Sequence, residues 1–299
     1  MNIRNRLPFI RLRAWLSRKI PVRRSWHAAQ IRGAASYGDE LPVYEFMTRI
    51  PTIRWSTEAM PDLLTRHILF EGLYQEDVVE ALLGLSPRGG VVFDIGAHHG
   101  FMSLVAALAV GADGRVAAFE PNPLSIRHLE RNLARNRSAQ VEIVSAAVGD
   151  RIGTVSLNIQ KGTATWNTSI YQEFIQRGYE IEQREVPMTT IDAYVRETGL
   201  VPNVMKIDVE GAECLVLKGA QETIERHRPA LIMEFNPAAA QAAGTTIGEL
   251  VNGLFRQGYR LFALRRNRWG RYSFKRQEPF DEKRHCRDDL ANVVCISEE

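Results

Sequence analysis

Residues 91 to 104 read Val-Val-Phe-Asp-Ile-Gly-Ala-His-His-Gly-Phe-Met-Ser-Leu. The apolar run that ends in Asp94 predicts a buried strand, and the apolar spacing over residues 101 to 109 predicts a helix. Gly96 and Gly100 bracket a tight turn, where a side chain would stand in the path of a ligand that approaches the backbone. Because the first N–H groups of a helix lack partners within it, the strand, turn and helix together predict a nucleotide pocket.

The acidic residues indicate which nucleotide binds. The glycine spacing lacks the Gly-x-Gly-x-x-Gly of a pyrophosphate site, and a carboxylate at Asp94 would repel a pyrophosphate but suits an ammonium group. Residues 115 to 119 predict a second buried strand, which ends in Glu120, where an acidic residue holds a ribose diol. Either carboxylate alone could instead cap the next helix. An ammonium group, a ribose and no phosphate together indicate S-adenosylmethionine.

Length and composition fit a globular chain. With 299 residues, 45% hydrophobic and 24% charged, the sequence can form one large α/β domain with additions, or at most two domains. No apolar run approaches the ~20 residues needed to span a bilayer. The cysteines, Cys214, Cys286 and Cys295, are odd in number and lack metal-ligand spacing, so we expect a reducing, cytoplasmic location without disulfides. The net charge of +3 is too small to define a partner.

Residues 1 to 40 form a basic N-terminal arm. Residues 1 to 33 contain arginines and a lysine but no acidic residue, and the apolar side chains between them include Trp15 and Trp26. Such a stretch could lie on the inner face of an anionic membrane, with its indoles at the interface. Its apolar runs are too short for a secretory signal peptide. A solvated arm, contact with an acidic glycan and contact with nucleic acid are left open.

Residues 41 to 90 read as a helical preamble that packs over the strand tips and closes the pocket. Helices are predicted over residues 57 to 67 and residues 76 to 85. We interpret His67 as a core histidine and Glu76 as a surface carboxylate.

Strands and helices alternate from residue 91 to residue 299, which predicts a parallel sheet with helices on both faces and an antiparallel hairpin at one edge. An adenine would lie against backbone groups of residues 146 to 150. Residues 153 to 159 and 185 to 188 alternate like a strand pair, and the polar segment 161 to 183 is either a lid or acceptor-binding loop, or an ordinary surface excursion. The other expected strands are 141–145, 204–209, 230–235, 259–264 and 292–296, and the other helices are 125–135, 190–198, 212–226 and 247–256.

A second informative stretch, at residues 204 to 213, reads Val-Met-Lys-Ile-Asp-Val-Glu-Gly-Ala-Glu. Its strand carries Asp208 and Glu210 to the carboxyl edge of the sheet, beside Gly96. The fifth strand carries Glu234 to the same edge. Since ligands bind outside that edge in open α/β sheets, these carboxylates are expected at the site.

Several stretches resemble the FkbM-type methyltransferases. They are Asp-Ile-Gly-Ala-His-His-Gly at 94–100, Phe-Glu-Pro-Asn-Pro at 119–123, Thr-Thr-Ile-Asp at 189–192, Lys-Ile-Asp-Val-Glu-Gly-Ala-Glu at 206–213, Leu-Lys-Gly-Ala at 217–220 and Arg-Pro-Ala-Leu-Ile-Met-Glu at 228–234. The resemblance implies a class I, Rossmann-like fold with a mostly parallel seven-stranded sheet. It also implies O-methylation of a hydroxyl, commonly on a sugar of a polysaccharide, glycolipid or secondary metabolite. His98 and His99 depart from the family, which more often has Asn and a small or aliphatic residue, so neither inherits a family role.

Methyl transfer to a sugar hydroxyl requires close positioning and a base, because such a hydroxyl is a poor nucleophile. By position, Asp208 and Glu210 are the expected bases, and Glu234 and His99 are further candidates. Asp208 could instead hold the methionine ammonium. The residues expected to bind the cofactor are Asp94, Gly96, Ala97, Gly100, Glu120, Pro121, Asn122, Ala146, Ala147 and Asp208.

The sequence also leaves open a metal ion and three other functions. We assign no metal ligands, although a Mg²⁺ shared by Asp208, Glu210 or Glu234 would fit hard oxygen ligands. The arginines suggest a nucleic-acid methyltransferase, but the chain lacks the Asn/Asp-Pro-Pro-Tyr type of loop used in base methylation. A non-enzymatic S-adenosylmethionine-binding protein and a nicotinamide-dependent oxidoreductase are the other rivals. The intact set Asp94, Gly96, Gly100, Glu120 and Asp208 disfavours the first of these. Asp94 in the loop and the missing third glycine disfavour the second.

Overall fold

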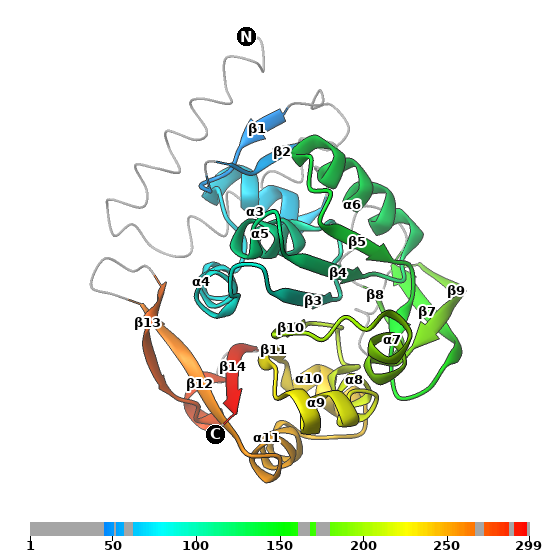
Figure 1. Cartoon of the computed structure of the whole chain (residues 1–299). Coiled ribbons are helices and arrows are strands. Elements are labelled where there is room, and N and C mark those ends of the chain that lie inside the picture. Colours follow the sequence, from blue (N-terminus) through cyan, green and yellow to red (C-terminus); the bar gives the residue numbers. More distant parts are fainter. Residues whose placement is uncertain are drawn as a thin grey trace.

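The computed structural model describes residues 45–50, 52–56, 62–160, 168–171, 180–266, 272–286 and 290–297. Its centre is a large mixed sheet (Figure 1). In spatial order the strands are β13 (Tyr272–Pro279), β12 (Tyr259–Arg266), β14 (Ala291–Ser297), β11 (Ala230–Phe235), β10 (Val204–Ile207), β3 (Val91–Ile95), β4 (Arg115–Phe119) and β5 (Val141–Val144). The strands from β11 to β5 run parallel, and β14, β12 and β13 are antiparallel to their neighbours.

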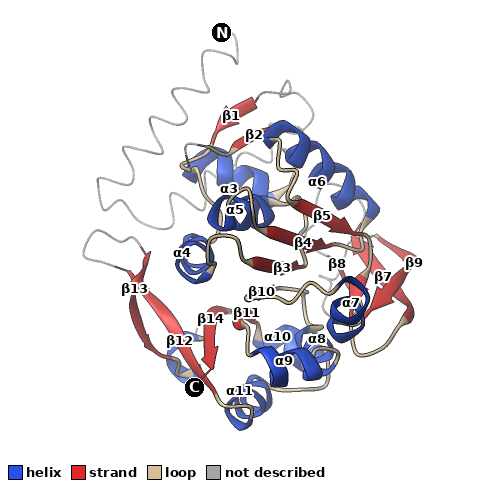
Figure 2. Ribbon diagram, in the orientation of Figure 1, coloured by secondary structure: helices blue, strands red, loops and turns tan. Residues whose placement is uncertain are grey.

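Helices cover both faces of this sheet, as predicted (Figure 2). Successive strand residues point to opposite faces, so Val92 and Phe93 belong to different cores. The core of Val92 includes residues of α3 (Leu63–Glu71), α4 (Glu76–Leu85), α5 (Phe101–Val110) and α6 (Pro123–Asn136). The core of Phe93 includes residues of α7 (Ile191–Thr198), α8 (Glu213–Lys218), α9 (Gln221–His227), α10 (Pro237–Ala242) and α11 (Ile247–Arg256). The molecule is therefore an α/β structure of three layers.

A smaller sheet lies beside the end of the main one. Its strand order is β6 (Ala147–Val148), β9 (Ile181–Thr189), β7 (Gly153–Gln160) and β8 (Thr168–Ser169). The antiparallel pairing of β7 with β9 confirms the predicted strand pair. Part of the polar segment expected as a lid lies outside the described residues, but its strand β8 pairs with β7 through Asn158 and Ser169.

Two elements of the main domain differ from the sequence prediction. The helix expected over residues 212 to 226 is broken into α8 and α9 at Gly219, where a Cβ atom would lie 1.9 Å from the carbonyl oxygen of Gly149. Among the described residues the main sheet has eight strands rather than seven, because the arginine-rich excursion returns as β13 and lengthens the antiparallel edge.

The preamble contains a hairpin as well as helices. Strands β1 (Glu45–Met47) and β2 (Arg54–Ser56) pair antiparallel, which the sequence did not predict. Helix α4 has the predicted bounds, and the first predicted helix begins at residue 63, after the cap residue Asp62. Glu76 forms an ion pair with Arg49, and its side chain is only 20% exposed. The basic arm, residues 1 to 40, lies outside the described residues. Within the described part of the chain, no helix is both long and apolar enough to traverse a bilayer.

Candidate active site

A cavity that is partly open to solvent lies at the carboxyl edge of the parallel strands. Loops after β3, β4, β5 and β10 form its wall together with β8. The preamble adds Leu64, Tyr74 and Gln75, so it covers the strand tips as expected. The predicted site residues on the wall are Gly96, Ala97, Glu120, Pro121, Ala146, Ala147, Asp208 and Glu210. The predicted residues that lie elsewhere are Asp94, His99, Gly100, Asn122 and Glu234.

Asp94 lies behind this wall, not on it. Its side chain is 1% exposed, and its Oδ2 atom accepts a hydrogen bond from Ser103 Oγ at 2.6 Å. Its Oδ1 atom lies 3.4 Å from Nζ of Lys206. The ammonium group that the sequence led us to expect beside Asp94 is therefore present, but it belongs to the protein.

Lys206 contacts both the loop after β3 and the loop after β10. Its Nζ atom donates a hydrogen bond to the carbonyl oxygen of Gly96 at 2.9 Å and lies 3.4 Å from Oδ2 of Asp208. Burial alone would lower the pKa of Lys206, but the Asp208 and Asp94 carboxylates outweigh it and raise that pKa above its usual value. Lys206 is thus a buried cation that two carboxylates hold in its charged form.

The two glycines of the turn are required by packing within the protein. Both have positive φ, 83° at Gly96 and 84° at Gly100. A Cβ atom at residue 96 would lie 1.9 Å from the carbonyl oxygen of Asp208, and one at residue 100 would lie 2.2 Å from Cδ1 of Leu129 in α6. We had expected a ligand to occupy these positions. Instead, the β10 loop and α6 approach the turn so closely that only glycine fits.

Glu120 anchors the turn from the tip of β4. Its carboxylate accepts backbone N–H groups from His98 at 2.7 Å and from Asn122 at 2.8 Å. Burial raises the pKa of Glu120 to about 7, although the two N–H donors lower it. Asn122 caps α6 by accepting from the N–H of Leu124 at 3.0 Å, so it supports the site from behind.

Three carboxylates gather beside the cavity. Oxygen atoms of Asp208, Glu210 and Glu234 all lie within 4.8 Å of one another. Burial and the charge of Asp208 raise the pKa values of Glu210 and Glu234 well above their usual range. Gln75 of the preamble donates to Glu234 at 3.2 Å. The strand tips therefore meet as predicted, and two of the three acids are held in an environment that favours their protonated form.

The loop that carries Glu210 is fixed on both sides. Oε1 of Glu213 accepts the backbone N–H groups of Val209 at 3.1 Å and Gly211 at 3.3 Å. From β8, Ser169 Oγ donates to the carbonyl oxygen of Glu210 at 2.7 Å. Glu210 itself has φ of 53°, a conformation that is uncommon for a residue other than glycine. These contacts hold the loop in that conformation.

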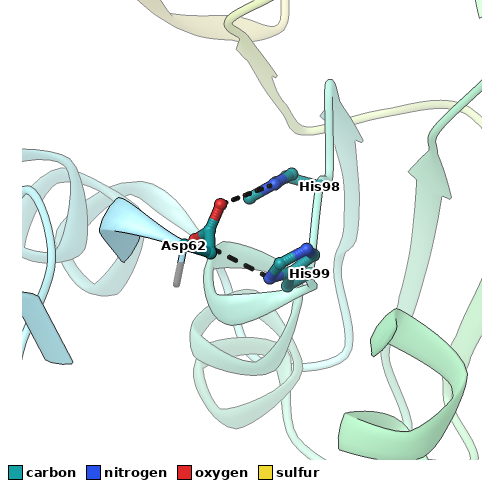
Figure 3. Close-up of side chains that lie close together, drawn as sticks. All are labelled: Asp62, His98 and His99. Atoms are coloured by element: carbon teal, nitrogen blue, oxygen red, sulfur yellow. Dashed lines mark ion pairs between the residues drawn. The ribbon is translucent and has the colours of Figure 1, made fainter. Parts of the chain in front are cut away.

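His98 and His99 point toward the preamble (Figure 3). The Asp62 carboxylate lies 3.6 Å from Nε2 of His98 and 3.9 Å from Nδ1 of His99. Burial lowers the pKa of His98, and burial and the neighbouring histidines lower that of His99 further. His99 is fully buried and its ring lies beside His128. The structure therefore does not bring His99 to the cavity with the three carboxylates.

Three polar residues at the cavity, Tyr74, Gln75 and Lys206, were given no role in the sequence analysis. Tyr74 and Gln75 lie between two helices and carry no recognisable pattern. Ser169 lies within the segment 161 to 183 that the sequence analysis interpreted as a lid or acceptor-binding loop or an ordinary surface excursion, although its two-residue strand was not predicted. Lys206 had a detectable signal, because a lysine between Met205 and Ile207 in a buried strand needs an anionic partner.

The comparisons with known proteins agree on methyl transfer. The family model described as the methyltransferase FkbM domain matches residues 94–261. A curated relative, the hexuronic acid methyltransferase AglP of Haloferax volcanii, is 27% identical over 220 residues, which cover 72% of this chain and 77% of that protein.

Two solved structures of methyltransferases align with this chain, both with a TM-score below 0.5. Methyltransferase FkbM from Methylobacillus flagellatus KT aligns with a TM-score of 0.41 and 16% identity, over 78% of this chain and 53% of that chain, so the match spans about half its length. An S-adenosylmethionine-dependent O-methyltransferase from Thermotoga maritima aligns with a TM-score of 0.40 and 15% identity, over 76% and 68% of the two chains. With its family match over more than half its length, this chain belongs to the FkbM-domain methyltransferases, class I enzymes that use S-adenosylmethionine.

Proposed function

We propose that this enzyme transfers the methyl group of S-adenosylmethionine to a hydroxyl of a sugar in a polysaccharide, glycolipid or glycosylated metabolite. The curated relative, a hexuronic acid methyltransferase, supports a sugar as the acceptor. The observation that carries the proposal is the carboxylate group of Asp208, Glu210 and Glu234 beside the cavity, because an alcohol acceptor requires a base at that place.

The lining of the cavity suits both the ribose and the adenine of S-adenosylmethionine. Each carboxylate oxygen of Glu120 accepts one backbone N–H group and retains a lone pair for a ribose hydroxyl. Ala146 and Ala147 give a wall of small side chains and backbone groups for the adenine. Ala97 contributes the backbone of the turn. These residues would hold the adenosyl part of the cofactor.

Asp208 and Glu210, the two acids on the cavity wall, would act on the acceptor. S-adenosylmethionine supplies an electrophilic methyl group. Asp208 is the base in our proposal, because the ammonium of Lys206 at 3.4 Å stabilises its negative charge. Glu210 lies on the cavity wall, and because its pKa is raised it would donate a hydrogen bond to another oxygen of the acceptor. Glu234 lies off that wall, so we assign it no contact with the acceptor. Neighbouring carboxyl groups with different environments commonly take acid and base roles in this way.

Replacement of Asp208 by Asn tests the assignment. We expect kcat to fall by about 10²–10⁴, the usual contribution of a general base. The S-adenosylmethionine affinity, measured by calorimetry, should change little. Asp113→Asn, at an exposed turn residue, is the matched control. If Asp208→Asn turns over at the wild-type rate, Asp208 is not the base.

A Mg²⁺ ion at the same carboxylates is a second proposal, favoured by the short separations among their oxygen atoms. In that case, dialysis against EDTA would abolish turnover and Mg²⁺ would restore it. Turnover that is unchanged after chelation would leave Asp208 to act as a base without a metal.

Two further proposals concern what this chain binds besides S-adenosylmethionine and a sugar. We propose that residues 1 to 33 contact an anionic membrane surface, a location at which a glycolipid acceptor would be met. Cosedimentation with anionic vesicles, but not with neutral ones, would support this contact. Acceptor binding that weakens steeply with salt would instead favour the rival nucleic-acid acceptor.

A further inference from the structure

Asp62, His98 and His99 form a second cluster of chemically active side chains, separate from the three carboxylates. Figure 3 shows both imidazoles facing the Asp62 carboxylate from the turn between β3 and α5. One nitrogen of each ring and one carboxylate oxygen all lie within 4.8 Å of one another. The cluster joins two segments of the chain, the start of α3 and the cofactor-binding turn.

The backbone brings these groups together. His98 has φ of 51°, and this turn of the chain lets two consecutive side chains point the same way. Their rings are stacked, with centroids 3.7 Å apart and planes inclined by 16°. Asp62 is the N-cap of α3 and accepts the N–H of Leu64 at 2.9 Å, so the helix fixes its carboxylate.

The donor set is that of a transition-metal site. Two imidazole nitrogens and a carboxylate oxygen are common ligands of Zn²⁺, Co²⁺ and Fe²⁺, and open positions are left for water. Bonds of about 2.0–2.1 Å place neighbouring ligand atoms in a tetrahedral site about 3.4 Å apart. Here Nε2 of His98 lies 3.6 Å from Oδ2 of Asp62, and Nδ1 of His99 lies 3.9 Å from Oδ1, the other oxygen of the same carboxylate. If the three side chains moved slightly together and one imidazole rotated out of the stack, both nitrogens and one carboxylate oxygen would lie within bonding distance of one ion.

We propose that Asp62, His98 and His99 bind a divalent transition-metal ion of the Zn²⁺ type. The site goes beyond the proposed methyl transfer and does not depend on it. Since imidazole nitrogens prefer Zn²⁺ and Co²⁺ to Mg²⁺, the site differs in selectivity from the carboxylates of Asp208 and its neighbours.

An ion at this position would tie the preamble to the cofactor-binding turn. The backbone N–H of His98 donates to Glu120 at 2.7 Å, and the side chain of His98 lies on the cavity wall. The ion would therefore hold in place the residue that orients the ribose-binding carboxylate, without touching the reacting groups. Its role would be structural, behind the cavity wall.

The test is metal binding by the full-length, untagged protein after removal of bound ions with EDTA. Titration with ZnCl₂ followed by calorimetry, and with CoCl₂ followed by visible absorption, reports affinity and coordination. We expect one ion per chain, and a loss of affinity of at least about 100-fold in His98→Gln and His99→Gln. His67→Gln, a change in the same region outside the cluster, and Asp208→Asn, in the other cluster, should bind as wild type does.

Asp62→Asn separates metal binding from folding, because asparagine also caps helices. It should keep the circular dichroism spectrum and lose the ion. In wild type, Zn²⁺ should raise the melting temperature by mass action, and in the three cluster variants it should not. Binding that survives all three substitutions, or that is lost in Asp208→Asn instead, overturns the proposal.

Discussion

Nζ of Lys206 lies 3.4 Å from Oδ1 of Asp94, and both side chains are buried in adjacent parallel strands. Asp94 begins the stretch at residues 94–100 that resembles the family, and Lys206 begins the one at residues 206–213. The pair therefore couples the two stretches directly. Since Lys206 also donates a hydrogen bond to the carbonyl oxygen of Gly96 and lies 3.4 Å from Asp208, it aligns the two loops at the cavity.

Lys206→Met should strongly destabilise the protein. Removing the cation leaves the buried carboxylate of Asp94 without its counter-charge, and breaking such a pair costs about 3–5 kcal/mol. Urea unfolding measures the change. The double variant Asp94→Asn with Lys206→Met should recover part of the loss, because no isolated charge is then buried. A Lys206→Met protein as stable as wild type would contradict this account.

Gly96→Ala should disrupt the site by displacing the β10 loop. The new Cβ atom would lie 1.9 Å from the carbonyl oxygen of Asp208, at a residue with φ of 83°. We expect a loss of at least about 2 kcal/mol of stability, from backbone strain and overpacking, together with weaker S-adenosylmethionine binding. Gly253→Ala is the control, because it lies in α11 with no atom within 4 Å of its Cβ position. Equal effects of the two substitutions would rule out the steric explanation.

Glu213→Gln should change how stability depends on pH. Burial raises the pKa of Glu213 from 4.5 to about 7, so its ionisation disfavours the folded state. Stability from this group is complete below pH 4.5 and is lost as pH rises through 7. Glutamine keeps an oxygen for the N–H groups of Val209 and Gly211, so the variant should gain up to about 3 kcal/mol at pH 8.

Urea unfolding at several pH values checks this prediction. The variant's stability should be flatter than that of wild type between pH 4.5 and 7. Glu225→Gln, at an exposed position of α9, should leave the wild-type profile unchanged. A Glu213→Gln profile that parallels wild type would show that Glu213 is already ionised at low pH.

Ser169→Ala should weaken acceptor use through the Glu210 loop. Ser169 Oγ donates to the carbonyl oxygen of Glu210 at 2.7 Å, and the loss of one such hydrogen bond costs about 1 kcal/mol, or roughly fivefold in kcat/KM. On our proposed function, the KM for the acceptor should rise while the S-adenosylmethionine affinity stays the same. Ser156→Ala, on the neighbouring strand β7, is the control. An acceptor KM that is unchanged in Ser169→Ala would exclude this role.

The regular elements could be predicted from sequence where local signals were strong. The bounds of α11 were correct because Thr246 and Glu249 form a capping box at its start. The break between α8 and α9 was missed because it depends on the contact of Gly219 with Gly149, which is distant in sequence. The three-residue strands β1 and β2 are too short to show a periodic pattern.

The site could be predicted in outline but not in its internal contacts. Glu120 and Asp208 reach the cavity because parallel strands end at one edge, a rule that the sequence pattern reveals. The position of Asp94 behind the wall depends on Lys206, and the two residues are neighbours only after the strands pair. Tyr74 reaches the cavity from a separate segment, and its position follows from how the preamble packs.

The outer wall of the cavity is built by Leu64, Tyr74 and Gln75, which precede the segment that matches the family model. Strand β14, which inserts between β11 and β12, comes after that segment. A fragment or chimaera made only from residues 94–261 would thus carry an incomplete sheet and an open cofactor chamber. Recombination between relatives should therefore give a folded protein with a closed cavity only when both flanking segments are transplanted together with residues 94–261.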